Sequence, residues 1–243
     1  MTTVEFDNEF DILYDSIASL GAPELDGYEK SVFLTKAQLE LIKEVNGPGN
    51  KYGTSFEGSD KRRVDMRELI KDYKVTPTVL AGGISDNSFT AGIPKDCFLI
   101  KYESAFYNKP GCTKDSKIDI VPIKYDEYHQ NMRNPFRRPD SQNGYRLDMK
   151  SNDSGKFVEL VTEKPIHTYQ IRYVQYPIPI VLMDLEGIAP GEGLSVDGIS
   201  TISECVLDQE FHREILDRAV QLAMLAYKGE ALQTKVQLDQ RNN

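Results

Sequence analysis

DQEFHREILDRAVQLAMLAYK, residues 208–228, carries the clearest helical pattern in the chain. Its apolar residues recur at three- and four-residue spacing, which places them on one face of a helix. They are Phe211, Ile215, Leu216, Ala219, Leu222, Ala223 and Ala226. The alanines allow another helix to approach closely, whereas His212 falls on the polar side, where we expect it to be solvated. This helix therefore needs apolar partners from earlier in the chain.

A first partner lies near the N-terminus, where Phe6, Phe10, Leu13, Ile17 and Leu20 follow one another at spacings of four and three. This spacing predicts an amphipathic helix, with its acidic residues mostly on the other sides. The glycine that follows should end it.

Thr35–Gln38 predicts the start of a second partner helix. Its sequence is that of a capping box, in which a threonine hydroxyl and a glutamine side chain satisfy free amides at a helix start. We expect the helix to run from Lys36 to Val45, with Tyr28–Phe33 as a separate helical turn. Asp65–Glu68 repeats the capping pattern and predicts a short helix to about Asp72.

From residue 73 the chain changes to short β-branched and aromatic runs separated by turn residues, the pattern of strands. The predicted strands are Val75–Leu80, Cys97–Tyr102, Ile118–Tyr125, Phe157–Val161, Thr168–Val174 and, last, Val181–Leu185. Residues 186–202 then form a glycine-rich loop. Short strands joined by tight turns favour a mostly antiparallel sheet.

Helices at both ends with strands between them predict an α+β fold. Residues 1–74 form the N-terminal part of a helical bundle, and residues 186–228 supply the loop and helix that complete it. Residues 75–185 form an inserted, mostly antiparallel β region. Residues 229–243 are polar, lack a sustained apolar pattern and form a C-terminal arm.

Composition narrows the possible functions. The chain has 243 residues and a net charge of −9, which argues against a protein that coats nucleic acid, because phosphate contacts need clustered Lys and Arg. Residues 1–46 alone hold ten Asp or Glu against three Lys, an acidic surface suited to solubility or to a partner. The three cysteines, Cys97, Cys112 and Cys205, are far apart and indicate reduced thiols of a protein made in the cytosol. No apolar run approaches the roughly 18 residues of a membrane span, so no membrane partner is expected.

The sequence offers little that is typical of enzymes or metal sites. His129, His167 and His212 stand apart, without the i,i+4 spacing of paired metal ligands. A nucleophilic pair of Cys97 with His129 stays open on sequence grounds, as does a small-molecule enzyme with its site in the β region. The interpretation we favour is a protein that is not an enzyme, with no catalytic, cofactor-binding or metal-binding residues.

One cluster is unusual: Asp126–Pro139, DEYHQNMRNPFRRP. A short polar helix should end at its Asn-Pro pair, after which arginines surround a phenylalanine. The residues are Arg133, Phe136, Arg137 and Arg138. One interpretation is a solvated loop with the phenylalanine in the core. The other is an ion-pairing contact with an acidic neighbouring subunit, or a contact with passing nucleic acid.

Four stretches of the sequence together resemble a known protein family: Tyr28–Ala37, Asn134–Arg137, Tyr169–Leu182 and His212–Val220. In this order they resemble the neck proteins of tailed bacteriophages, in particular the ring proteins of crAss-like phages, and among these the first ring or head–tail adaptor. The resemblance spans about residues 5–230. None of the four stretches carries chemistry, so the set as a whole provides the specificity.

This resemblance implies a structural protein of the virion neck or tail, made in the host cytoplasm. Such adaptors form a homo-oligomeric ring, usually of twelve copies, between the portal protein and the next neck or tail ring protein. DNA passes through the channel without sequence-specific binding, and the family core is a helical bundle. A stopper or a tail terminator is the alternative position in the particle.

A ring needs two complementary faces on each subunit, because one contact repeats until the ring closes. The arginine cluster around Phe136 is a candidate for one face. The acidic first helix, with Asp7 and Asp11, is a candidate for the other. An acidic channel wall would also repel DNA and let it slide.

In related adaptors a C-terminal arm docks against the portal, and residues 230–243 stand in that position. The candidate anchors are the apolar Leu232, Val236 and Leu238, with Gln233 and Gln237 as hydrogen-bonding residues. The alternative is a disordered tail, which binding would order at an entropic cost.

Overall fold

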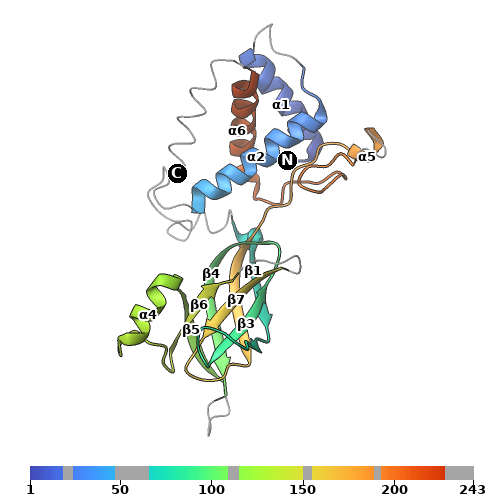
Figure 1. Ribbon diagram of the computed structural model, residues 1–243. Helices are drawn as coiled ribbons and strands as arrows, with labels where there is room; N and C mark the ends of the chain where they lie inside the picture. The colour runs from blue at the N-terminus through green and yellow to red at the C-terminus, as the bar shows by residue number, and fades with distance from the viewer. Residues whose placement is uncertain (19–23, 47–65, 109–114, 150–154, 189–192, 228–243) are drawn as a thin grey trace. The chain divides into compact units, whose positions relative to one another are not determined.

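The computed structural model describes residues 1–18, 24–46, 66–108, 115–149, 155–188 and 193–227. The chain divides into two compact units, each built from its own elements (Figure 1). Met1–Leu69 and Pro177–Asn243 form a helical unit, and Ile70–Tyr176 forms a strand unit. Helices and a mostly antiparallel sheet together give the α+β fold class predicted from the sequence.

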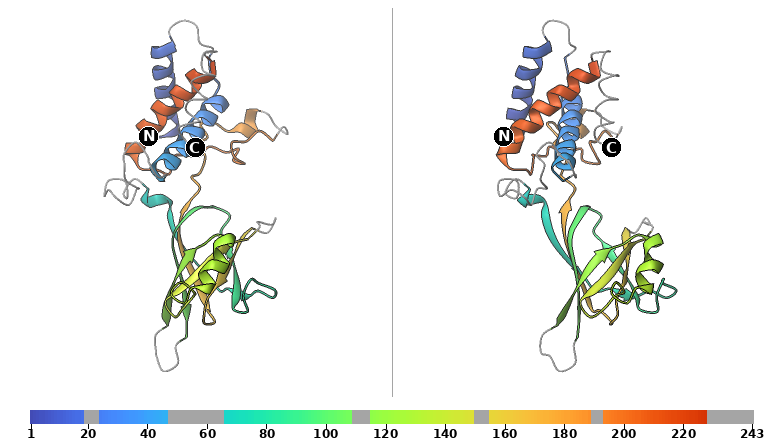
Figure 2. Two further views of the ribbon diagram at one scale, coloured as in Figure 1. Left: turned by 60° about the vertical axis from the view of Figure 1, so that its left-hand side comes forward. Right: turned by 90° about the vertical axis from the view of Figure 1, so that its left-hand side faces the viewer.

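Three long helices pack together in the helical unit. They are α1 (Thr3–Ala18), α2 (Gly27–Asn46) and α6 (Gln209–Tyr227). Helix α6 packs against both α2 and α1, and Figures 1 and 2 show the three side by side. The apolar faces are buried, including Phe6 and Phe10 on α1 and Ile215 and Ala219 on α6. The helix near the N-terminus and the helix of residues 208–228 are thus confirmed over their described residues.

The environment of His212 corrects the prediction that this side chain is solvated. His212 is 4% exposed, and its ring centroid lies 5.2 Å from that of Phe6. Its Nε2 donates to the Leu207 carbonyl oxygen at 2.9 Å, while Nδ1 lies 2.7 Å from the main-chain nitrogen of Met1. Burial lowers the pKa of the imidazole, so the neutral ring is favoured. Helical spacing alone does not show that the segment before α6 contacts this ring.

Helix α2 is continuous, so the prediction of a separate turn before residue 36 is wrong. Its capping box is formed by Asp26 and Glu29: the Glu29 amide donates to Asp26 Oδ1 at 2.7 Å, and the Asp26 amide donates to Glu29 Oε2 at 3.2 Å. Thr35, the predicted cap, is buried within the helix, where its hydroxyl donates to the Ile180 carbonyl and accepts from the Ile180 amide. A tertiary contact uses the side chain that the local pattern assigned to capping.

The strand unit is one curled sheet. Its strands are β1 (Ile70–Val75), β2 (Thr78–Val79), β3 (Ser88–Ile93), β4 (Cys97–Tyr107), β5 (Ser116–Pro122), β6 (Asn143–Asp148), β7 (Lys156–Val161) and β8 (Thr168–Gln175). Across the described residues their order is β1-β8-β4-β5-β6-β7-β3-β2. Neighbours are antiparallel except β5 and β6, which run parallel. The sequence predicted β4, β5, β7 and β8, but it did not predict β3 and β6.

Two short segments correct their predictions. Where a capping pattern predicted a helix, Arg67–Leu69 forms a 3-10 turn (η2) and β1 begins at Ile70. All six residues of β1 pair with β8, and this non-local pairing outweighs the local pattern. Where a last strand was predicted, Val181 makes only an isolated bridge to Ser203, and the chain then enters α5 (Leu185–Ile188).

The parallel pair β5–β6 explains the position of α4 (Tyr125–Arg133). Parallel neighbours need a crossover connection, and the chain from β5 to β6 runs through this helix. Tyr128 of α4 is buried against Tyr145, Leu147 and Val161 of the sheet. A small core of its own therefore fixes α4, and the loop that follows it, to the strand unit.

The strand unit also contains a buried charged cluster. Glu103 of β4 accepts a hydrogen bond from Arg146 Nη1 at 2.7 Å and another from the Tyr169 hydroxyl at 2.5 Å. Burial raises the pKa of Glu103, and the Arg146 guanidinium only partly offsets this effect. The cluster joins β4, β6 and β8 through side chains, in addition to the backbone hydrogen bonds of the sheet.

Candidate assembly interface

The loop after α4 fixes its backbone with hydrogen bonds. The Phe136 amide donates to Asn134 Oδ1 at 3.0 Å, and the amides of Arg137 and Arg138 donate to the Asn134 carbonyl oxygen at 3.0 and 3.1 Å. From the sheet, the Tyr145 hydroxyl donates to the Arg137 carbonyl. The loop is therefore held both at the helix end and by β6, and it does not depend on a packed aromatic side chain.

The side chains of this loop point into solvent. Phe136 is 97% exposed, so the interpretation that places it in the core is wrong. Arg133, Arg137 and Arg138 are exposed as well, and in the described part of the chain none of them forms an ion pair. We call these four residues the Phe136 tip. An exposed aromatic side chain among guanidinium groups is a composition typical of protein-binding hot spots.

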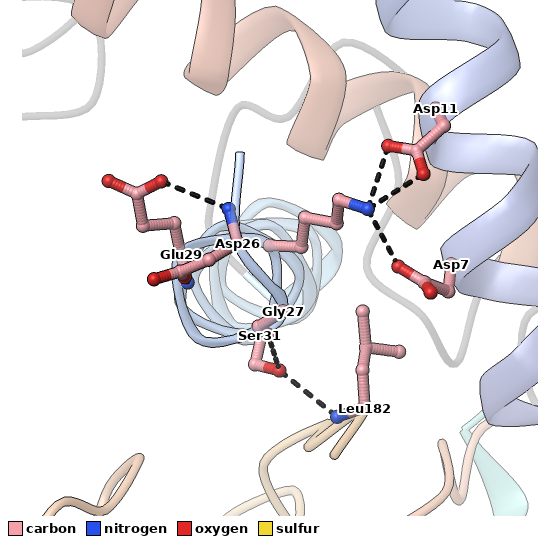
Figure 3. A network of polar contacts seen from close by, with 8 residues as sticks. Asp7, Asp11, Asp26, Gly27, Glu29, Ser31 and Leu182 are labelled. Carbon is pink, nitrogen blue, oxygen red and sulfur yellow. Dashed lines mark hydrogen bonds and ion pairs between the residues drawn. The ribbon is translucent and has the colours of Figure 1, made fainter. Parts of the chain in front are cut away.

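Asp7 and Asp11, the acidic residues predicted for the other face, are engaged within the chain (Figure 3). The Lys30 ammonium of α2 lies 2.8 Å from Asp7 Oδ1 and 2.7 Å from Asp11 Oδ1. Burial lowers the pKa of Lys30, but hydrogen bonds to Asp11 and Asp7 outweigh burial, and the pKa is raised overall. The ammonium stays charged and holds α1 against α2, while both carboxylates remain about half exposed to water.

The start of α2 is packed closely on another side as well. The Leu182 amide donates to the Ser31 hydroxyl at 3.0 Å, as Figure 3 shows. A Cβ atom added at Gly27 would lie 2.5 Å from the sulfur of Met183, so glycine permits this close approach. The contact also shows how a segment predicted as a strand satisfies one of its amides by bonding to a helix side chain.

A second acidic surface lies on another side of α1. Val4, Asn8 and Ile12 form one row at i,i+4 spacing, and Glu5 and Glu9 form the adjacent row. All five are exposed, and the apolar Val4 and Ile12 are 67% and 66% exposed. We call these five residues the α1 outer face. The two exposed apolar side chains are a signal that the sequence already contained, because they fall outside the buried spacing of Phe6 and Phe10.

An open cleft of about 650 Å³ lies between the start of α1 and the start of α6. Its lining residues are Met1, Glu5, Glu9, Gln209, Glu210 and Arg213. The lining thus carries three carboxylates and one guanidinium, an excess of negative charge that suits the approach of a cationic side chain. Sequence reasoning missed this cleft because α1 and α6 are far apart along the chain.

Cys97 and His129, the side chains considered for catalysis, lie in surroundings that do not activate a nucleophile. Cys97 is buried, and burial raises the pKa of its thiol to about 11, whereas a nucleophilic cysteine needs a lowered pKa. His129 stands on α4 with its ring 5.4 Å from the Tyr128 ring. Within the described ranges, no three His, Cys, Asp or Glu side chains gather as a metal site, and no helix is long and apolar enough to cross a membrane.

The predicted docking arm falls outside the described residues. Its candidate anchors are Leu232, Gln233, Val236, Gln237 and Leu238. Of the predicted interface residues, the four of the Phe136 tip lie at the end of α4 and in the loop that follows it, in the strand unit. The structure brings Asp7 and Asp11 together around Lys30 in the helical unit.

Comparison with known proteins establishes the family. A family profile described as "Phage tail ring protein 3/4" matches residues 1–235. The chain belongs to this family. It is 39% identical to "Ring protein 4/5" of Bacteroides phage crAss001 over 247 residues, which cover 100% of both chains. It is 38% identical to "Ring protein 3" of the same phage over 231 residues, which cover 93% of this chain and 96% of that relative.

The resemblance read from four short stretches, to the ring proteins of crAss-like phages, is confirmed by these matches. Membership implies a structural ring role in the tail or neck of the virion, and it indicates no catalytic function.

Proposed function

We propose that the chain is the subunit of a closed ring that acts as an adaptor between the portal and the tail of a crAss-like phage. The observation that carries this proposal is the match over nearly the whole chain to proteins named as rings. A closed ring needs two different, complementary surfaces on each subunit. The cationic Phe136 tip and the acidic α1 supply surfaces of opposite charge, and α1, α2 and α6 serve as the bundle that forms the subunit core.

The position of the ring along the tail axis is a second part of the proposal. The relatives carry the numbers 3 and 4/5, which supports a stack of several rings. We therefore place other ring proteins on both sides of the chain, in preference to the direct portal contact expected from the likeness to a first ring. Residues 230–243, with Leu232 and Val236 among their anchors, are the arm that docks on an axial neighbour.

The ring's charge suits the passage of DNA. A net charge of −9 on each subunit, repeated around a ring of about twelve copies, repels phosphates from the channel wall. Repulsion lets DNA slide during genome ejection, whereas a basic wall would retain it. The adaptor therefore works mechanically, by joining neighbours and keeping a channel open.

Cryo-electron microscopy of purified virions tests the proposal. The expected result is a rotationally symmetric layer between the portal and the tail end, into whose density the helical unit and the strand unit each fit as rigid bodies. Density at the channel plug or at the tail terminus would instead assign the stopper or terminator role. Absence of the chain from purified virions would contradict a structural role in the particle.

A further inference from the structure

The Phe136 tip of the strand unit and the α1 outer face of the helical unit are complementary in charge, and both expose apolar side chains. We infer that the Phe136 tip of one copy docks on the α1 outer face of the next copy, with Glu9 as the carboxylate that a tip arginine engages. This inference rests on the proposed ring, and it replaces Asp7 and Asp11 as the acidic partners by residues of another side of the same helix.

The first argument is that Asp7 and Asp11 are unsuitable partners. Both carboxylates already bind Lys30, which is only 6% exposed. A guanidinium that captured them from outside would leave a buried ammonium without its counter-ions, which is strongly unfavourable. A neighbouring subunit gains more from carboxylates that do not neutralise a buried charge.

The second argument distinguishes the carboxylates of the cleft. Glu5 accepts the Thr2 amide at 2.8 Å and caps the first turn of α1. Glu210 stands in the first turn of α6, where the helix N-terminus favours a negative charge. Glu9 lies one turn further along α1 than Glu5 and also lines the cleft. Of these three carboxylates, Glu9 is the least stabilised by the partial positive charge of a helix N-terminus. It therefore offers the strongest attraction to a cation.

The third argument concerns apolar surface. Phe136 is 97% exposed, and Val4 and Ile12 beside the two glutamates are 67% and 66% exposed. Placing the aromatic ring over the row of Val4 and Ile12 removes all three side chains from water. In that arrangement a tip arginine lies over the adjacent row of Glu5 and Glu9. Apolar and charged residues therefore match row by row, and the repeated contact connects a strand unit to the helical unit of the next copy.

A charge-swap experiment with the full-length chain tests this contact. Arg137→Glu and Glu9→Lys are prepared separately, and self-association is measured by analytical ultracentrifugation at low and high salt. Each variant alone should associate about tenfold more weakly than the unaltered chain, because a close attraction becomes a repulsion. An equimolar mixture should recover to within about threefold, because every junction in an alternating ring then pairs opposite charges.

Glu204→Lys is the matched control, because Glu204 is exposed in the same unit, lies outside the cleft lining and undergoes the same charge change. It should associate like the unaltered chain, and thermal unfolding should show that all three variants are folded.

The inference is overturned if mixing brings no recovery or if the control weakens association equally. It is also overturned if Arg137→Glu weakens the binding of duplex DNA but leaves self-association unchanged. The same holds if the unaltered chain does not self-associate at its solubility limit. A ring seen in virions together with a failed swap would reject this contact and leave the proposed function standing.

Discussion

Both units of the chain hold a cation against carboxylates, but they bury the charges to different degrees. In the strand unit, the side chains of Arg146 and Glu103 are 12% and 6% exposed, and the Tyr169 hydroxyl donates to the same carboxylate. In the helical unit, the Lys30 side chain is 8% exposed, but its partners Asp7 and Asp11 are 45% and 51% exposed.

This difference separates charges that are shut away from water from charges that solvent reaches. A fully buried cluster has no water to replace a lost partner, so removing one member leaves the others unsatisfied. A half-exposed cluster keeps contact with water, so its ion pairs respond to salt. The strand unit therefore uses its cluster as a fixed support for the sheet that carries the Phe136 tip, while the carboxylates of the Lys30 cluster stay in contact with solvent.

The largest expected effect comes from Glu103→Ala. It removes the acceptor of both Arg146 and Tyr169 and leaves a buried guanidinium without its closest partner. We expect a loss of about 3–5 kcal/mol in the free energy of unfolding, measured by urea denaturation followed by circular dichroism.

Asp148→Ala is the control for that prediction. Asp148 lies 3.2 Å from Nε of the same Arg146, but its side chain is 77% exposed. Its removal should cost less than about 1 kcal/mol, as is usual for exposed ion pairs. Equal losses for the two variants would mean that burial does not distinguish the two carboxylates.

A smaller effect is expected from Lys30→Met, which keeps most of the side-chain volume but removes the ammonium. Asp7 and Asp11 would lose their counter-ion, yet both remain hydrated, so we expect a loss of about 1–2 kcal/mol. The difference from the unaltered chain should shrink as salt is raised towards 1 M, because salt screens half-exposed pairs. Lys36→Met, an exposed lysine of the same helix, should have little effect. A loss that is independent of salt would assign the role of Lys30 to packing.

The elements that the sequence predicted correctly are those with a long local pattern. The spacing of Phe6 and Phe10 and the apolar face around Ile215 both identified helices, because periodicity reports which side of an element is buried. Strands β3 and β6 were missed because Gly92 and Gly144 interrupt them and weaken the strand signal. The glycine at position 144 of β6 has a structural reason: an added Cβ would lie 2.8 Å from the Ile120 side chain on the parallel neighbour β5.

The candidate site was only partly predictable for a related reason. Composition singled out the arginines around Phe136, but it left two interpretations of that ring, and only the structure shows that it is exposed. The pairing of Lys30 with Asp7 and Asp11 joins two helices, and helical spacing within one segment carries no information about such contacts. Thr35 shows the same limit, because a side chain suited to capping bonds instead to Ile180, which is distant in sequence.

The smallest expected effect is an opposite response of two carboxylates to acid. Hydrogen bonds from Arg172 lower the pKa of the exposed Asp72 below its ordinary 3.8, whereas burial raises the pKa of Glu103 above its ordinary 4.5. In an NMR titration of carboxyl carbons, Asp72 should therefore titrate below pH 3.8 and Glu103 above pH 4.5.

The consequences for stability have opposite signs. The contribution of Asp72 is present above pH 3.8 and is lost as the pH falls through its lowered folded-state pKa, at a cost of about 0.2–1 kcal/mol for an exposed pair. Glu103 binds its proton more readily in the folded chain, so acidification through its raised pKa favours the folded state. Arg172→Ala should raise the pKa of Asp72 and leave that of Glu103 unchanged, because Arg172 bonds only to Asp72 among the contacts of the described residues. A Glu103 that titrated below Asp72 would show that the Arg146 guanidinium outweighs burial, and the contrast between a buried and an exposed cluster would then no longer account for the charges of the strand unit.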